Sequence, residues 1–426
     1  MTALRPRPVE VKRKALEAYR PVVGDELIAD LRERGYHLRG LRLLHLSSTA
    51  TGGGVAEMLS CLVPLQRDAG LAAEWRVVAG DASFFGATKR IHNALQGMHV
   101  SLSAEDRQEY LRHNEATARH LDGEWDVIVV HDPQPAAVRA FTPRTSARWL
   151  WRCHVDSSQP EPDVWNFLRP FVERHDQAVF TMPAFIPPDL GTRATAVAPA
   201  IDPLTSKNRV LPEYLARETV AEFGIDLARP LMLQVSRFDP WKNPLGVIAA
   251  WRRARESVPG LQLAMVGSMA SDDPEGWEVY QSLQAETAGE RDCFLFTNQL
   301  GVAHHEVNAF QRVADVAVQM STREGFGLVV SETLWKATPM VAGSAGGIPL
   351  QLEDGVSGLI ADGVDAVAAA VVALLEDPDR AAGFGVAGHA RVRERFLAPR
   401  LLRDELALLS ALVGQPPPTA AVAPAG

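Results

Sequence analysis

Five loops of this 426-residue chain carry residue types that could bind a phosphate or a sugar. The first contains three consecutive glycines at 52–54, after an apolar run at 41–46 and before a helical pattern that starts at Val55. Glycine lets backbone N–H groups approach an anion at the start of a helix. The spacing matches neither GxGxxG nor GxxxxGK[ST], so it predicts no standard dinucleotide or P-loop site. Phosphate contact and a flexible turn both remain open for this loop.

The second loop, 236–243, places Arg237 and Lys242 between an apolar run and a helix whose start Pro244 marks. An arginine offers a planar fork of donors and a lysine offers a point charge, so the pair could clamp a diphosphate. The alternative is two solvated surface cations.

The third loop, EGFGLVVSE, places Glu324 in a loop and Glu332 eight residues later inside an apolar helix. Both carboxylates could accept hydrogen bonds from sugar hydroxyls, and Gly325 and Gly327 would allow close backbone approach. In the alternative interpretation Glu332 lies on the helix surface. A carboxylate in a buried helix, however, normally has a partner or a function.

Two histidine loops, each following an apolar run, contribute His131 with Asp132 and His154 with Asp156. Because the carboxyl ends of parallel strands share one sheet edge, these four side chains are expected to collect there. They also resemble a metal-ligand set, although no third clustered histidine has zinc spacing. Sugar binding, metal ligation and a structural role in the loop backbone all remain open.

Short apolar runs alternate with helical patterns in both halves, which predicts two doubly wound parallel α/β domains. The Pro-rich and polar stretch near 200–212 breaks this rhythm. The expected strands are 41–46, 75–79, 126–130, 149–153, 178–181, 231–236, 261–266, 293–297, 316–320 and 339–342.

The domains are therefore predicted as 1–205, with an N-terminal extension at 1–40, and 206–390. A C-terminal helix at 391–414 could pack back on either domain, and 415–426 has the composition of a disordered tail. Ligands of open α/β sheets bind at the carboxyl ends of the strands, so the expected site is a cleft across which the two domains face each other.

Charge and composition exclude several classes of protein. Lys and Arg number 43 against 52 Asp and Glu, and a net charge of −9 argues against a general nucleic-acid binder. No run of 18 apolar residues predicts a membrane span, and the basic N-terminus lacks the apolar stretch of a signal peptide. Three distant cysteines without a CxxC pair indicate no zinc or disulfide framework. These features predict a cytoplasmic protein without a nucleic-acid or membrane partner.

Taken together, the loops resemble the retaining glycosyltransferases of family 4, which have the GT-B fold. Glu324 and Glu332 match the E-x7-E element that is this family's hallmark. The Gly-rich loop, Arg237, Lys242 and the Gly346–Gly347 loop follow in the family's order. The chain is most similar to trehalose synthases of the glycosyl-transferring type, in the segments HLSSTATGGGVAEML, VHDPQP, WRCHVDSSQP, QVSRFDPWKNP and STREGFGLVVSE.

The resemblance implies reversible transfer of glucose from a nucleoside-diphosphate glucose to free glucose, which forms trehalose. The catalytic residues that it implies are His154, Arg237, Lys242 and Glu324. The donor-binding residues that it implies are Gly53, Gly54, Asn298, Gln299, Leu300, Gly325, Phe326, Gly327, Leu328 and Glu332. The candidates for the acceptor glucose are Asp132, Gln134 and Asp156.

The resemblance also implies front-face attack, in which a phosphate oxygen takes the acceptor's proton. No protein nucleophile is then expected, and no metal or other cofactor is required, because Arg237 and Lys242 can supply the positive charge. A homodimer is implied as well, and the donor base could be that of ADP, UDP or GDP. The alternatives are a trehalose phosphorylase, a retaining glucosyltransferase with another small acceptor, and a nucleotide-sugar epimerase.

Overall fold

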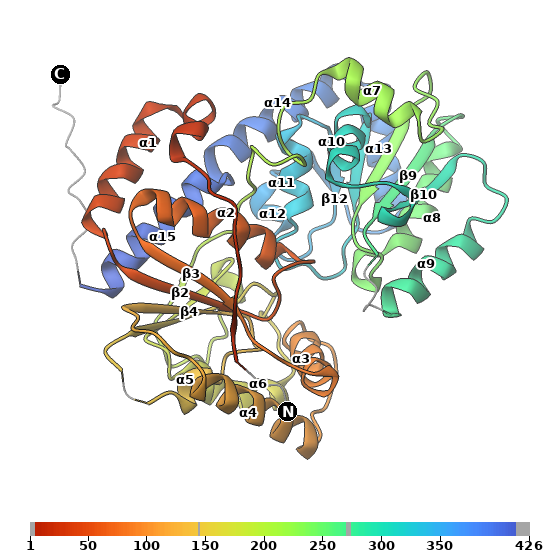
Figure 1. Ribbon diagram of the computed structural model, residues 1–426. Helices are drawn as coiled ribbons and strands as arrows, with labels where there is room; N and C mark the ends of the chain where they lie inside the picture. Colours follow the sequence, from red (N-terminus) through yellow and green to blue (C-terminus); the bar gives the residue numbers. More distant parts are fainter. Residues whose placement is uncertain (1–4, 144, 270–273, 415–426) are drawn as a thin grey trace. The chain divides into compact units, whose positions relative to one another are not determined.

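The computed structural model of the chain describes residues 5–143, 145–269 and 274–414, which form two compact units (Figure 1). The first unit holds the described residues up to Pro199 and those from Ala398 onward, and the second holds Ala200–Leu397. The sequence placed the boundary slightly later, at 205/206, and the tail expected at 415–426 lies outside the described residues. No helix in the described ranges combines the length and the apolar character needed to cross a membrane.

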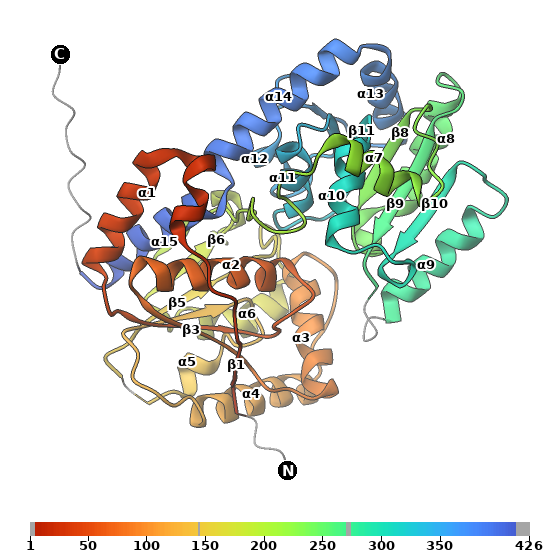
Figure 2. The ribbon, with the colours of Figure 1, turned by 45° about the horizontal axis from the view of Figure 1, so that its top comes forward.

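The first unit is built on a seven-stranded sheet in the order β1-β3-β2-β4-β5-β6-β7. Figure 2 labels β1, β3, β5 and β6 of this sheet. The short β1 pairs antiparallel with β3, and the other pairs are parallel. The strands are β1 (Arg7–Pro8), β2 (Arg42–Ser47), β3 (Ala72–Val77), β4 (Val127–His131), β5 (Arg148–Arg152), β6 (Gln177–Phe180) and β7 (Ala194–Ala196).

Helices form separate layers against this sheet. Alternate strand residues such as Leu44 and Leu46 belong to a core that includes residues of α3, α4 and α6. Elsewhere in this unit α1, α2 and α15 contact one another, although α15 is far from α1 and α2 in the sequence. The helices are η1 (Leu16–Tyr19), α1 (Arg20–His37), α2 (Gly54–Ala69), α3 (Ala82–Leu95), α4 (Ala104–Arg119), α5 (Val138–Phe141), α6 (Pro162–Val172), η2 (Pro183–Phe185) and α15 (Ala398–Leu412).

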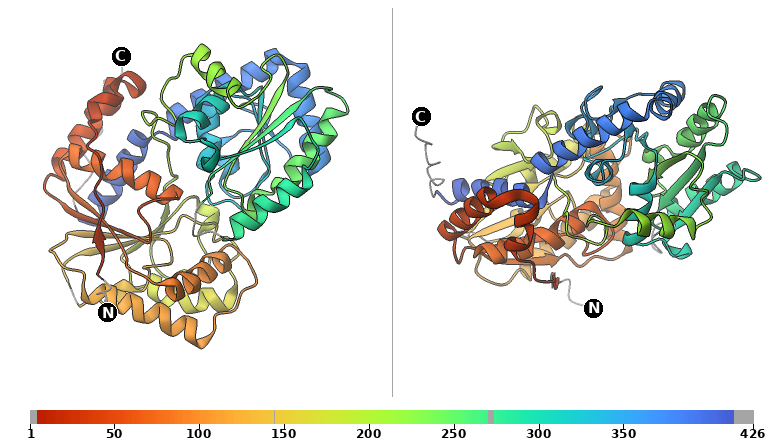
Figure 3. Two further views of the ribbon diagram at one scale, coloured as in Figure 1. Left: turned by 45° about the vertical axis from the view of Figure 1, so that its right-hand side comes forward. Right: turned by 90° about the horizontal axis from the view of Figure 1, so that it is seen from above.

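The second unit has a six-stranded parallel sheet in the order β10-β9-β8-β11-β12-β13. Helices lie on both sides of this sheet in the left view of Figure 3, where the unit is coloured from green to blue. Its strands are β8 (Leu231–Val235), β9 (Gln262–Gly267), β10 (Cys293–Thr297), β11 (Val316–Gln319), β12 (Met340–Ala342) and β13 (Leu359–Ile360). Its helices are α7 (Glu213–Ala221), η3 (Pro240–Lys242), α8 (Pro244–Arg255), α9 (Pro274–Glu286), η4 (Asn298–Leu300), α10 (His304–Val313), α11 (Leu328–Trp335), α12 (Ile348–Gln351), α13 (Val364–Glu376) and α14 (Pro378–Arg395). Two apolar clusters fill this unit, as expected when both faces of a parallel sheet are covered.

The prediction of a single C-terminal helix at 391–414 is wrong in one respect, because parts of two helices occupy this stretch. α14 ends at Arg395 and α15 begins at Ala398. If the helix continued through, the ring of Pro399 would clash with the carbonyl of Arg395. The chain breaks instead, and Leu397 forms an isolated parallel bridge with Ile201.

Candidate active site

The loop after β8 carries Arg237 and Lys242 on a backbone fixed by its own side chains. Asp239 accepts a hydrogen bond from the Trp241 N–H at 2.9 Å and so caps η3. Asn243 follows with a left-handed φ of 50° and caps α8. Arg237 is exposed, with Nη2 3.1 Å from Asp239 Oδ2. Its side chain is therefore accessible to a ligand without losing a buried partner.

Glu324 follows β11, the strand that pairs with β8 in the sheet. The Lys242 Nζ lies 2.5 Å from Glu324 Oε2, and the Ser321 hydroxyl donates to the same oxygen at 3.2 Å. The Lys242 side chain is 16% exposed and that of Glu324 is 9% exposed, so this ion pair is mostly shielded from water. The structure thus brings two predicted residues, 82 positions apart, together at neighbouring strand ends.

A second glycine loop supports the backbone around Glu324. A Cβ on Gly346 would lie 1.6 Å from the Glu324 carbonyl oxygen, and one on Gly347 would lie 2.7 Å from the Gly325 carbonyl oxygen. Gly346 also has a φ of +54°. The Gly346–Gly347 pair therefore allows a backbone-to-backbone approach that no other residue permits.

The segment after Glu324 leads directly into α11. Phe326 is buried and packs against Phe396, with ring centroids 5.5 Å apart. Gly327 has a φ of +79° and precedes Leu328, the first residue of α11. Gln351 of α12 donates to the Phe326 carbonyl, so the loop is held from a second element.

Glu332 lies inside α11 with 1% exposure, which excludes the surface alternative. Its Oε1 is 2.9 Å from the Nζ of Lys207, while Oε2 is buried without a hydrogen-bond partner among the described residues. One turn later, Lys336 donates to the Glu332 carbonyl at 3.0 Å and to Asn208 Oδ1 at 2.8 Å. Burial lowers the pKa of Lys336 to about 7. The unpartnered oxygen of Glu332 is therefore available to a donor group from a ligand.

The predicted base-binding segment, Asn298–Leu300, forms η4 directly after β10. The Asn298 side chain is already used: Oδ1 accepts from the Met269 N–H at 2.8 Å and Nδ2 donates to the Met269 carbonyl at 3.1 Å. Gln299 and Leu300 are exposed. Asn298 thus joins the loops after β9 and β10, and its backbone and its two neighbours remain open to a base.

In the first unit, the Gly-rich loop leads into α2, whose first helical residue is Gly54. No side chain in the described part of the chain caps this helix, and its N-cap, Gly53, has an extended backbone. A Cβ on Gly52 or Gly53 would meet no atom within 4 Å, although Gly52 has a φ of +81°. Packing within the described residues therefore does not explain the glycine at 53.

The two histidine loops meet through the side chains themselves. His131 Nδ1 lies 3.0 Å from His154 Nε2, and His131 Nε2 lies 2.9 Å from Nδ1 of His45 in β2. His45 Nε2 lies 3.0 Å from Oε1 of Gln66 in α2. Burial lowers the pKa of His45 to about 4 and holds those of His131 and His154 well below their usual range. All three imidazoles are therefore neutral at neutral pH.

His45 and Gln66 lie outside all of the predicted site loops. A signal existed, because His45 interrupts an apolar strand and Gln66 interrupts an apolar helix. The pairing of His45 with Val129 in the β2–β4 register places His45 and His131 on the same face of the sheet, since alternate residues share a face.

The three acceptor candidates differ in what their side chains already bind. Asp132 has a left-handed φ of 64°, and its Oδ1 accepts from the His154 N–H at 2.8 Å. Burial raises the pKa of Asp132 to about 7. Asp156 Oδ1 accepts from the N–H and the hydroxyl of Ser158, at 3.0 and 2.6 Å. The Oε1 of Gln134 is buried without a hydrogen-bond partner among the described residues.

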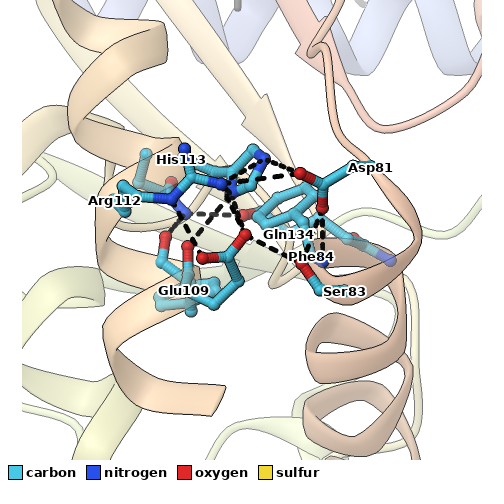
Figure 4. A network of polar contacts seen from close by, with 9 residues as sticks. Asp81, Ser83, Phe84, Glu109, Arg112, His113 and Gln134 are labelled. Carbon is cyan, nitrogen blue, oxygen red and sulfur yellow. Dashed lines mark hydrogen bonds and ion pairs between the residues drawn. The ribbon is translucent and has the colours of Figure 1, made fainter. Parts of the chain in front are cut away.

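A separate polar network joins α3 to α4 (Figure 4). One potential metal-ligand atom from each of Asp81, Glu109 and His113 lies within 4.8 Å of the other two, so this set could hold a metal ion. Arg112 already supplies positive charge there, with Nη2 2.5 Å from Glu109 Oε1 and 3.5 Å from Asp81 Oδ2. Ser83 bridges the two carboxylates at 2.8 and 2.9 Å. We assign this network to holding the two helices together.

Comparison with known families covers both units. Residues 45–187 match the family model described as "Trehalose synthase, N-terminal domain", and residues 216–391 match "Glycosyl transferases group 1". Among solved structures, an alpha,alpha-trehalose-phosphate synthase (UDP-forming) from Burkholderia xenovorans, in complex with glucose-6-phosphate, is similar with a TM-score of 0.69. It is 16% identical, and the match covers 87% of this chain and 99% of that one. The chain is thus a glycosyltransferase with two Rossmann-like units of the GT-B fold, which confirms the predicted fold class.

Curated relatives narrow the assignment. A trehalose synthase from Rubrobacter xylanophilus is 49% identical over 407 residues, which cover 94% of this chain and 98% of that protein. A trehalose synthase from Pyrococcus horikoshii is 41% identical over 406 residues, covering 95% and 97%. The chain belongs to the trehalose synthase family of glycosyltransferases, as the sequence motifs predicted.

Proposed function

We propose that the chain is a retaining glucosyltransferase that moves glucose reversibly from a nucleoside-diphosphate glucose to free glucose, forming trehalose. The observation that carries the proposal is the meeting of Lys242 and Glu324 at the carboxyl ends of β8 and β11. The cation that we propose for the diphosphate would then lie beside the carboxylate that we propose for the sugar hydroxyls, in the part of an α/β sheet where ligands bind.

The second unit would hold the donor. Arg237 and Lys242 would bind the diphosphate, while Glu324 and the backbone of Gly325–Gly327 would hold the glucose hydroxyls. The buried Oε2 of Glu332 would accept hydrogen bonds from the ribose hydroxyls, which would explain why it has no partner among the described residues. The base would lie against Asn298–Leu300.

In the proposed reaction the bond between C1 of glucose and the diphosphate oxygen breaks. The acceptor hydroxyl oxygen bonds to C1 on the same face, and its proton passes to the departing phosphate oxygen. Negative charge grows on the diphosphate in the transition state, so the largest contribution comes from positive groups already fixed there. Arg237 and Lys242 would supply this charge, and no protein nucleophile is needed.

The first unit would contribute the acceptor residues. Asp132, Gln134 and Asp156 are the proposed contacts of the acceptor glucose, and His154 would face the reacting sugar. Gly53 and Gly54 would approach the distal phosphate, consistent with the open space around Gly53. Asp132 accepts from the His154 N–H of the neighbouring loop and Asp156 accepts from Ser158 in its own loop, so both carboxyl groups are held in place for a ligand.

The decisive test incubates the enzyme with free glucose and, in turn, ADP-, UDP- and GDP-glucose, and reads the product by NMR. The expected product is α,α-linked trehalose, formed only when acceptor is present. In the reverse direction, cleavage of trehalose should require a nucleoside diphosphate. Cleavage by inorganic phosphate would establish a phosphorylase instead, a different disaccharide would establish another acceptor, and a changed donor without acceptor would establish an epimerase.

The proposal extends to a cytoplasmic homodimer that needs no metal. Light scattering after size-exclusion chromatography should give twice the chain mass, and a monomer mass would overturn the dimer. Fractionation of the source cells should recover the activity with the cytoplasmic fraction. Activity should survive dialysis against EDTA. Complete loss that one divalent ion restores would show that Arg237 and Lys242 do not replace a metal.

A further inference from the structure

A hydrogen-bonded row of side chains runs through the first unit from Gln66 through His45 and His131 to His154. Its successive contacts measure 3.0, 2.9 and 3.0 Å. We propose that Gln66, acting through His45 and His131, sets which ring nitrogen of His154 carries the proton. Gln66, His45 and His131 are then positioning residues for the transfer reaction. Only the catalytic consequence rests on the proposed role of His154.

The position of the proton on one ring determines its position on the next ring because each ring is neutral. Gln66 and His45 are fully buried and His131 is 1% exposed, so a charged imidazole is strongly disfavoured. The Arg152 guanidinium also disfavours a proton on each ring. A neutral imidazole has one N–H and one lone pair, and each contact in the row needs one of each. Fixing the first contact therefore fixes all the others.

The direction follows from the Gln66 end. The Gln66 Oε1, which can only accept, faces His45 Nε2, so that nitrogen must donate. His45 Nδ1 then accepts from His131 Nε2, and His131 Nδ1 accepts from His154 Nε2. The row ends with the proton of His154 on Nε2 and a lone pair on Nδ1. His154 would thus offer an acceptor at Nδ1 to a hydroxyl of the reacting sugar.

The position of Gln66 supports a function for its carbonyl oxygen. Its Nε2 is buried with no hydrogen-bond partner among the described residues. A hydrogen bond of the amide nitrogen therefore does not explain why a polar residue occupies this position. Its neighbours on α2, such as Leu62, Val63 and Leu65, are apolar and buried. An apolar side chain would satisfy packing at this site, whereas only an acceptor orders the row.

The experiment reads the tautomers directly in full-length enzyme labelled with 15N-histidine. Long-range 1H–15N NMR at neutral pH separates protonated from bare ring nitrogens, and His→Gln variants assign the signals. The expected result is a protonated Nε2 and a bare Nδ1 on His45, His131 and His154. A proton on His154 Nδ1 in the wild-type enzyme would overturn the proposal whatever becomes of the Gln66 and His131 variants, because His154→Gln alone assigns that signal.

Variants test the transmission. Gln66→Met keeps the length of the side chain and removes the acceptor. The His154 signals should then move toward a mixture of tautomers, and kcat should fall roughly 10- to 100-fold, the loss seen when the partners that orient metal-ligating histidines are removed. His131→Phe should have the same effect, and the double variant should lose no more than either single one, because both act through one row. The control is Gln262→Met, which removes a buried glutamine bonded to Asp226 in the second unit. It should leave the His154 signals and kcat unchanged.

The outcomes distinguish a failure of the proposed proton arrangement in the row from a failure of the proposed role of His154. Unchanged His154 signals in Gln66→Met would overturn the row. Altered signals with unchanged kcat would uphold the row and overturn the catalytic role proposed for His154.

Discussion

Lys242 and Glu324 neutralise each other across two neighbouring strands, with Nζ 2.5 Å from Oε2. The two residues were assigned separate ligand groups, the diphosphate and the sugar, yet they form one ion pair. Removing either member leaves a poorly hydrated charge behind. Arg237 has no such link, because its ion-pair partner is Asp239 in its own loop. The two cations should therefore respond differently to substitution.

We expect Arg237→Ala and Lys242→Met each to lower kcat by roughly 10²- to 10³-fold, the usual effect of removing one group that stabilises transition-state charge. Lys242→Met should also lower thermal stability, because Glu324 loses its partner, whereas Arg237→Ala should not. Steady-state kinetics and melting curves check both effects. Arg253→Ala, which removes an exposed arginine paired with Glu256, is the control. Near-wild-type turnover in both test variants would refute the diphosphate clamp.

Glu332→Gln should weaken donor binding more than it slows the chemical step. The substitution keeps the shape and removes the charge, and a hydrogen bond to a charged group contributes about 1.5–3 kcal/mol. Titration calorimetry with the nucleoside diphosphate should therefore show a Kd higher by about one to two orders of magnitude. Glu353→Gln, at an exposed carboxylate paired with Arg391, should bind as the wild type does. An unchanged Kd in Glu332→Gln would show that this carboxylate does not contact the ribose.

Gly346→Ala tests the close approach of the two glycine loops. Its Cβ would overlap the Glu324 carbonyl oxygen, so the loop that carries Glu324 must move. The matched control is Gly355→Ala: Gly355 has a φ of +69°, but its Cβ would meet no atom within 4 Å. The control should lose only the cost of a left-handed residue, about 1–2 kcal/mol. Gly346→Ala should lose more stability and also donor affinity, and equal losses in the two variants would contradict the proposed support.

The fold was largely predictable because both sheets are parallel and buried, so their strands appear as apolar runs in the sequence. The α1 helix was missed because its mixed composition gives no clear apolar face, and it is stabilised instead by α2 and α15. At the candidate site, local motifs predicted Arg237, Lys242 and Glu324, since each follows a strand. The partners of these residues depend on register and packing. The Lys207–Glu332 pair and the Gln66–His45 contact join segments that no local pattern links.

Stability should fall steeply as the pH drops below about 6.5, because several buried histidines are neutral in the folded chain. Burial lowers the pKa of His45 and of His175 to about 4, against an ordinary value of 6.5. Below pH 6.5 these histidines bind protons in the unfolded chain but not in the folded chain. Their contribution to the free energy of unfolding is therefore fully present above pH 6.5 and is lost as the pH falls toward 4. Each such histidine contributes about 1.4 kcal/mol per pH unit in this window, or about 3 kcal/mol across it. Asp132 opposes the trend, because its raised pKa of about 7 favours the folded state as pH falls.

Urea unfolding at pH 5, 6, 7 and 8, followed by tryptophan fluorescence, measures this slope. His175→Gln isolates one histidine that lies outside the Gln66 row and keeps a side-chain donor for the Phe171 and Val172 carbonyls. The variant should lose about 1.4 kcal/mol per pH unit of the slope below pH 6.5. His99→Gln is the control, because His99 is almost fully exposed. It should leave the slope unchanged. A wild-type stability that stays flat from pH 8 to pH 5 would mean that these histidines are not held neutral by burial.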